Sequence, residues 1–238
     1  MKKIAFVLLA AVVLLNACID GHRVKGDGSM TSKTFQPGNF NGVELSAGFD
    51  VFLTQGSAAD VRIEAEQNIL SYIDVRVENG VLDIDSKEHV WLDPSRTVKV
   101  YITSPTYKSI ENSGSGHVTG QTKITHDGTL NISSSGSGEM SLDVDAPEIE
   151  ANVSGSGTVS LSGDTKKINA DVSGSGGISA LNLKSEESEL GISGSGNIDV
   201  YSSIKLDANI SGSGKIRYKG TAQVNKNISG SGEVTKVD

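Results

Sequence analysis

Apolar and polar residues alternate along most of the second half of the chain, with the period of two that is typical of a half-buried β-strand. Ile149, Ala151 and Val153 are apolar, and the residues between them are polar. The same phase returns in residues 168–180 and again in residues 206–218. The pattern predicts a series of similar strands, each with one face directed toward a common core.

The tetrapeptide Ser-Gly-Ser-Gly separates these strands and occurs seven times, at intervals of 22, 19, 19, 20, 18 and 18 residues. Its copies begin at Ser113, Ser135, Ser154, Ser173, Ser193, Ser211 and Ser229. Repetition at this period is typical of a solenoid, in which each unit buries its apolar face against the next. If the alternation continues through the tetrapeptide, both glycines point inward at a corner and both serines form outward ladders.

A coil of 18 to 20 residues, at about 3.3 Å per residue, has a perimeter of roughly 60 Å, which fits a flattened or three-sided coil. We therefore predict an all-β fold, a parallel β-helix-like solenoid. A meander of antiparallel hairpins that turn at each tetrapeptide is the alternative, because glycine pairs also serve hairpin turns. A flexible Gly/Ser linker is disfavoured, because it would have no reason to keep the alternation.

The first half of the chain, residues 34–109, is less regular and is expected to cap the solenoid. Residues 43–53 alternate, and residues 46–49 resemble a decayed copy of the tetrapeptide region. Asn79-Gly80 between two apolar runs predicts a β-hairpin. Residues 66–73 are compatible with one or two helical turns.

The N-terminus resembles a bacterial lipoprotein signal. Lys2 and Lys3 precede an apolar run over residues 4–15, and Leu-Asn-Ala-Cys ends at Cys18, the only cysteine of the chain. The run is too short for a comfortable membrane span, so we expect cleavage before Cys18 and acylation of that residue. An uncleaved anchor with a coincidental cysteine is the alternative.

Three segments follow from this interpretation. Residues 1–17 are a signal peptide, residues 18–33 are a tether, and residues 34–238 form one domain whose repeats occupy residues 110–238. Loss of Lys2 and Lys3 changes the formal charge from −8 to −10. Such an acidic protein is a poor partner for nucleic acid. We expect it to be anchored in the cell envelope by its acyl chains, at the outer membrane on an unspecified face.

Several segments together resemble a known family. They are residues 40–45 (FNGVEL), 51–56 (VFLTQG), 80–84 (GVLDI) and 100–105 (VYITSP), followed by the repeated Ser-Gly-Ser-Gly. In this order, and behind a lipobox, they resemble the bacterial putative auto-transporter adhesin, head GIN domain family, which is common in the Bacteroidetes. The resemblance implies a β-helix-type solenoid with a proposed role in adhesion and no catalytic residues. We expect the anchor here to be the lipid at Cys18.

Catalytic and metal-binding motifs are not found in the sequence. The four histidines have no metal-ligand spacing, and the residues after the glycines lack the repeated aspartate of calcium-binding solenoids. No cofactor is therefore expected. A glycan-active β-helix enzyme is the alternative. It would need converging acids, for which the candidates are Asp143, Asp145, Asp164, Asp171 and Asp207.

The predicted function is a non-enzymatic cell-envelope lipoprotein that acts as a binding, adhesion or structural module. Its partner would be a glycan or an envelope protein, and the candidate ligand contacts are Trp91, Tyr101 and Tyr107. The last coil should leave strand edges open, which predicts a homo-oligomer through that end or a capping partner.

Overall fold

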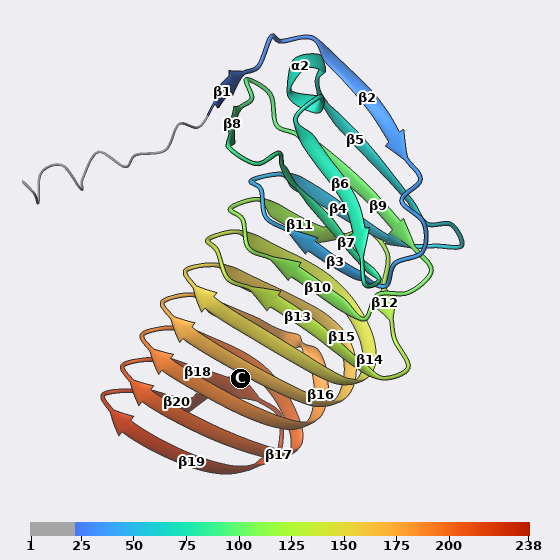
Figure 1. The fold of residues 1–238 in the computed structure, drawn as a ribbon. Helices are drawn as coiled ribbons and strands as arrows, with labels where there is room; N and C mark the ends of the chain where they lie inside the picture. The colour runs from blue at the N-terminus through green and yellow to red at the C-terminus, as the bar shows by residue number, and fades with distance from the viewer. Residues whose placement is uncertain (1–21) are drawn as a thin grey trace, which may run out of the picture.

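The computed structural model describes residues 22–238, which form a stack of β-coils with a mixed sheet at its N-terminal end (Figure 1). Strands make up 69% of the described residues and helix 2%, and the stack has about 7 turns. The predicted solenoid is thereby confirmed. The predicted signal peptide and Cys18 lie outside the described residues.

Four long strands form the regular part of the stack. They are β14 (Glu139–Gly155), β15 (Thr158–Gly174), β16 (Gly177–Gly194) and β17 (Asn197–Gly212). Each pairs with the next in parallel, and the register places tetrapeptide serines side by side, as with Ser154 and Ser173. Parallel pairing shows that the alternative of a hairpin meander is wrong.

Shorter strands begin and end the repeats. The first are β10 (Ser109–Asn112), β11 (His117–Gly120), β12 (Ile124–Thr125) and β13 (Thr129–Ser134). The last are β18 (Lys215–Lys219), β19 (Gln223–Gly230) and β20 (Glu233–Lys236).

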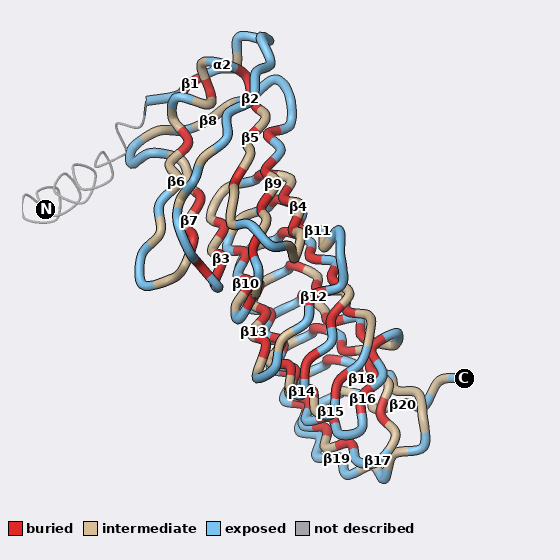
Figure 2. Tube along the Cα trace, turned by 90° about the vertical axis from the view of Figure 1, so that its right-hand side faces the viewer, coloured by how far each residue is buried: buried red, intermediate tan, exposed pale blue. Residues whose placement is uncertain are grey.

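The core is built from columns of apolar side chains that repeat from coil to coil. Val153, Val172 and Ile192 follow one another in register, and each is at most 3% exposed. Val159 and Ile178 form a second column, also fully enclosed. Figure 2 shows buried and exposed positions alternating along the coils. Because each coil covers the apolar side chains of its neighbour, one core runs through the stack.

The N-terminal half forms the cap. Antiparallel pairs join β2 (Met30–Phe35) to β5 (Asp60–Glu66), β5 to β9 (Lys99–Ser104), and β6 (Ile73–Glu78) to β7 (Val81–Ser86). Asn79 and Gly80 link β6 and β7 with φ values of 52° and 80°, as a two-residue hairpin turn requires. The predicted hairpin is confirmed, and so is the predicted short helix, α2 (Gln67–Leu70).

The order of the coils in space differs from their order in the sequence. β3 (Gly42–Leu45) pairs with both β7 and β10, and β4 (Asp50–Gln55) pairs with both β9 and β11. The coil of β3 and β4 therefore lies between β7 and β9 on one side and the repeats on the other. Residues 105–108 carry the chain from β9 past this coil to β10.

Residues 22–33, which were expected to lie in a tether, belong to the folded cap. β1 (His22–Lys25) pairs in parallel with β8 (Val90–Asp93), and β2 pairs with β5. The side chains of β2 are largely exposed. The expectation was wrong for these residues because a polar edge strand has the same composition as a tether, while its backbone pairs with a neighbouring strand on one side.

A buried carboxylate holds this N-terminal segment against the cap. Glu66 is fully buried and accepts hydrogen bonds from the hydroxyl and amide of Ser95, at 2.6 and 2.8 Å, and from the amide of Gly28, at 2.6 Å. The hydrogen bonds from Ser95 and Gly28 lower the pKa of Glu66. The ionised carboxylate thus connects β5 to the turn after β1 and to the loop before β9.

The last coil leaves strand edges open within the described part of the chain. β19 pairs with β17, and β20 pairs with β18, each on one side. The register places Lys226 in the inward column that Ala208 occupies in the preceding coil. An inward charge on an edge strand opposes edge-to-edge pairing. Homo-oligomer formation through this end stays a prediction, and Lys226 acts against it.

Candidate binding surfaces

The repeated tetrapeptides form the sharp corners of the coils. In the last five copies the first glycine has φ between 121° and 132°, a region that residues with a Cβ rarely adopt. A Cβ on Gly174 would lie 2.6 Å from the carbonyl oxygen of Gly155 in the neighbouring coil. The second glycine is buried in most copies, whereas the first is partly or fully exposed in all of them. The expectation that both point inward therefore holds for the second glycine only.

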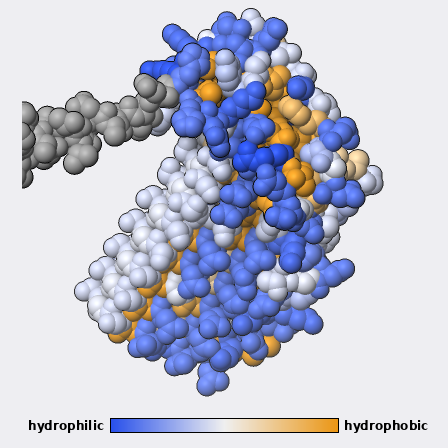
Figure 3. Space-filling view, in the orientation of Figure 1, coloured by the Kyte–Doolittle hydropathy of each residue, from blue (hydrophilic) through white to orange (hydrophobic). Residues whose placement is uncertain are grey.

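The serines of all seven tetrapeptides are exposed and form two columns, which we call the serine ridge. Successive copies are in register from Ser154 to Ser229, with the interstrand spacing of about 4.8 Å. Figure 3 shows a pale band along this edge of the stack. The predicted outward ladders are confirmed, and they give the molecule a straight edge of small hydroxyl groups.

Trp91 lies in β8, beside the end of the serine ridge nearest the cap. Its side chain is 65% exposed. It borders a groove of about 470 Å³ that also contacts Ser46, Asp85 and Ser115. Of the three aromatic residues predicted to contact a ligand, Trp91 presents the most accessible ring.

The other two predicted contacts have structural surroundings. Tyr101 stacks on Phe52, with ring centroids 5.0 Å apart, and the guanidinium of Arg62 lies 4.0 Å from its ring centroid. Tyr107 is fully buried, and burial raises the pKa of its phenol. The pocket bordered by Trp91 includes neither Tyr101 nor Tyr107.

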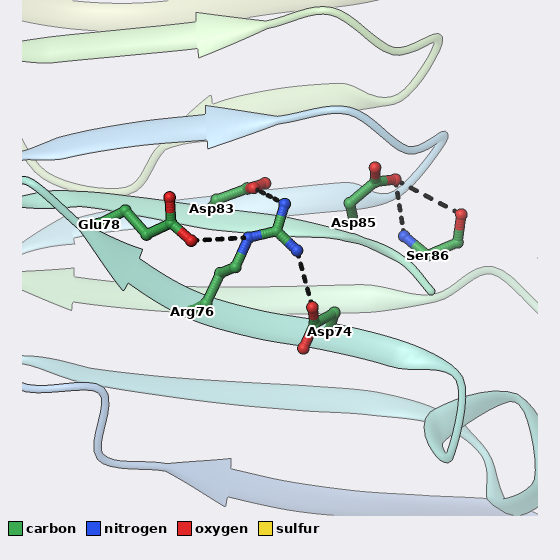
Figure 4. Close-up of polar contacts among 6 residues, drawn as sticks. All are labelled: Asp74, Arg76, Glu78, Asp83, Asp85 and Ser86. Carbon is green, nitrogen blue, oxygen red and sulfur yellow. Dashed lines mark hydrogen bonds and ion pairs between the residues drawn. The ribbon is translucent and has the colours of Figure 1, made fainter. Parts of the chain in front are cut away.

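An acidic column begins at the cap on the outer face of the coils. Asp83, Glu44 and Glu111 lie directly beside one another on β7, β3 and β10. Arg76 compensates one end of this column through ion pairs with Asp83 and with Asp74, the latter at 2.7 Å (Figure 4). Like charges in direct register are destabilising. Burial, then the charges of Glu111 and Asp83, raise the pKa of Glu44.

We expect Glu44→Gln to stabilise the protein near neutral pH. A carboxyl whose pKa is raised by folding is held protonated more tightly in the folded state. The stability penalty of ionised Glu44 is therefore full above its folded pKa and disappears as the pH falls below the unfolded value. The difference in midpoint of urea unfolding between Glu44→Gln and the parent should be largest at pH 7 and should shrink on acidification. A difference that grows toward low pH would contradict this electrostatic account.

A polar groove lies farther along the same face, at Gly191. The outward column that begins with the three acids continues through Ser133, Asn152, Asp171, Gly191, Asn209 and Asn227. The missing side chain at Gly191 opens a groove of about 430 Å³, which we call the Gly191 groove. Its lining includes Glu150, Asn152, Asn169, Asp171, Glu189 and Asn209.

The side chains of the Gly191 groove have unused hydrogen-bonding capacity. The Oδ1 atom of Asn169 is buried without a partner. Burial and the nearby charge of Glu189 raise the pKa of Asp171. Amides and carboxylates offer planar pairs of donors and acceptors that match neighbouring hydroxyl groups. The groove is therefore chemically suited to a polyhydroxylated ligand.

The five acids considered for a glycan-active enzyme are divided between surfaces. Asp143 and Asp164 flank Lys123, at 3.5 and 3.8 Å, and Asp145 lines a groove of about 680 Å³ together with Asp164. Asp171 lies in the Gly191 groove, and Asp207 forms an ion pair with Lys205. Asp143, Asp145 and Asp164 thus lie on one part of the stack, apart from Asp171 and Asp207. Residues 22–238 contain no cluster of three or more His, Cys, Asp or Glu arranged for a metal ion.

These features place the protein among the capped parallel β-solenoids, which present long repeated surfaces. The chain belongs to the family described as putative auto-transporter adhesin, head GIN domain, whose model matches residues 39–222. The resemblance inferred from the sequence is thereby confirmed. A search of curated proteins gives no match.

Solved structures of similar proteins have the same fold. A putative adhesin from Bacteroides fragilis is 25% identical, with a TM-score of 0.85 over 90% of this chain and 100% of that chain. A putative lipid binding protein from Parabacteroides distasonis is 26% identical, with a TM-score of 0.74 over 91% and 100% of the two chains. A putative adhesin from Parabacteroides merdae, 24% identical with a TM-score of 0.75 over 91% and 100%, supports the fold.

The family and these neighbours are described as adhesins or binding proteins, which indicates a binding module at the cell surface or in the envelope. No helix within residues 22–238 is long and apolar enough to cross a membrane. The Gly191 groove was missed in the sequence. Its one signal is a glycine at an outward position where the preceding coils have Asn152 and Asp171.

Proposed function

We propose that the protein is a non-enzymatic lipoprotein of the cell envelope that binds a hydroxyl-rich envelope polymer. The Gly191 groove carries this proposal, because it combines open space with amide and carboxylate side chains, among them Asn169, whose Oδ1 atom has no hydrogen-bond partner. Membership of an adhesin family supports a binding role. A stack with one continuous core also holds such groups in fixed positions. This favours binding, because the protein loses little conformational entropy when the ligand binds.

The anchor in this proposal is an acylated Cys18, and the outer membrane is the proposed location. We expect Cys18→Ser to move the protein from the membrane fraction to the soluble fraction, because two or three acyl chains are needed for stable attachment. Immunoblots of fractionated cells provide the measurement. Retention of Cys18→Ser in the membrane fraction would contradict lipid anchoring.

The binding site is tested by filling the groove. Gly191→Asn should abolish capture of envelope glycans on an array, since the new side chain enters the groove and displaces only the flexible carboxylate of Asp171. Ser193→Asn is the matched control, because Ser193 is exposed two residues away on the serine ridge. Equal capture by both variants would exclude the groove. Capture lost only after mutation of Trp91 would instead support the aromatic site predicted from the sequence.

A further inference from the structure

The outer face of the β1–β8 pair combines the only tryptophan of the chain with two basic residues. The register places Arg23 beside Trp91 and Lys25 beside Asp93. Because side chains alternate along a strand, these four residues share one face, which we call the β1–β8 face. Val24 on the opposite side is only 7% exposed and belongs to the core.

The β1–β8 face differs from the rest of the molecule in exposure and charge. Trp91 has the highest exposure, 65%, among the large hydrophobic residues that are exposed in the described chain. Arg23 forms an ion pair with Asp93 at 2.9 Å, while Lys25 adds a second positive charge. Two cations and one anion leave this face positive on a protein whose formal charge is −8.

The covalent distance to the proposed anchor limits where this face can lie. Only residues 19–21 separate Cys18 from His22, the first residue of β1. At no more than about 3.6 Å per residue, four steps along the chain span about 14 Å. An acylated Cys18 therefore keeps β1 close to the headgroup region. Figure 1 shows β1 and β8 together at one flank of the cap.

We propose that the β1–β8 face docks on the lipid surface, with the Trp91 indole at headgroup level and Arg23 and Lys25 near anionic headgroups. Tryptophan is enriched at membrane interfaces because its ring is amphipathic. Basic residues near an anionic leaflet gain further attraction. This proposal rests on the proposed acylation of Cys18. Docking through this face would fix the position of the cap on the membrane. The coils, with the Gly191 groove, would extend from the cap.

The single tryptophan allows a direct test on the mature acylated protein in vesicles of phosphatidylcholine and phosphatidylglycerol. We expect the fluorescence of Trp91 to shift to the blue relative to that of the Cys18→Ser protein in solution without detergent. Bromine-labelled lipids should quench the Trp91 fluorescence. Emission that stays at the water-exposed wavelength and resists the brominated lipids would overturn the proposal. A blue shift produced by soluble envelope glycans but not by lipid would overturn it in favour of a glycan site at Trp91.

Charge reversal separates docking from anchoring. Lys25→Glu should reduce the docked population in anionic vesicles by at least about fivefold, whereas Lys215→Glu, at an exposed site near the other end of the stack, should not change it. Mass spectrometry of Cys18 is recorded on each sample. Unmodified Cys18 would contradict the anchor and the docking together, whereas acylated Cys18 with an unaffected Trp91 signal would contradict the docking alone.

Discussion

Gly174→Ala is expected to lower the free energy of unfolding by about 2–5 kcal/mol. Two effects combine at this corner. The backbone has φ of 122°, which is strained for any residue with a Cβ. The added Cβ would also lie 2.6 Å from the carbonyl oxygen of Gly155, an atom of the neighbouring coil that cannot move without disturbing the sheet. Urea unfolding followed by circular dichroism provides the measurement.

Two control variants distinguish the loss of stability caused by the corner geometry from a general effect of mutation. Gly128→Ala should be neutral or slightly stabilising, because its φ is not in the positive region and its new Cβ would meet only the side chain of His126, at 3.5 Å or more. Ser175→Ala changes an exposed neighbour of Gly174 and should stay within about 0.5 kcal/mol of the parent. A Gly174→Ala protein as stable as these controls would show that the corner tolerates a side chain.

The repeats could be predicted because their signals are local. Alternation and the spacing of the tetrapeptide depend on residues close in sequence, and the hairpin at Asn79-Gly80 depends on two adjacent residues. The first glycine of the corner was assigned the wrong direction, because alternation was extended through a position where φ is positive, as at Gly155. Alternation describes a continuous strand, and it fails where the backbone turns.

The cap and the candidate site depend on pairing between distant segments, which the sequence does not express. β3 and β4 pair with strands that follow them by about 40 residues or more, and the polar segment of β2 pairs with β5. The Gly191 groove exists because three coils are in register around one glycine. Acids and amides on a solenoid surface are common. The sequence alone therefore does not show that several of them surround the space beside Gly191, because this depends on the register of the coils.

Tyr107 connects the cap to the repeats, and its loss should have the other large effect. The ring is fully buried in the crossover between β9 and β10, and its hydroxyl lies 3.0 Å from the carbonyl oxygens of both Thr54 and Ile102. The single proton is shared between these acceptors. Tyr107→Ala is expected to cost about 3–5 kcal/mol, since it empties a large buried site.

Tyr107→Phe isolates the hydroxyl, because the ring and its packing stay. It should cost about 1–3 kcal/mol, the penalty of leaving buried carbonyl groups without their donor. Tyr101→Phe is the matched control, because that hydroxyl donates to Glu64 at 3.4 Å from a partly exposed ring. We expect Tyr101→Phe to change stability by no more than about 0.5 kcal/mol. Equal losses from both phenylalanine variants would contradict a special role for the crossover. The expected difference would show that the Tyr107 hydroxyl stabilises the crossover through its buried acceptors.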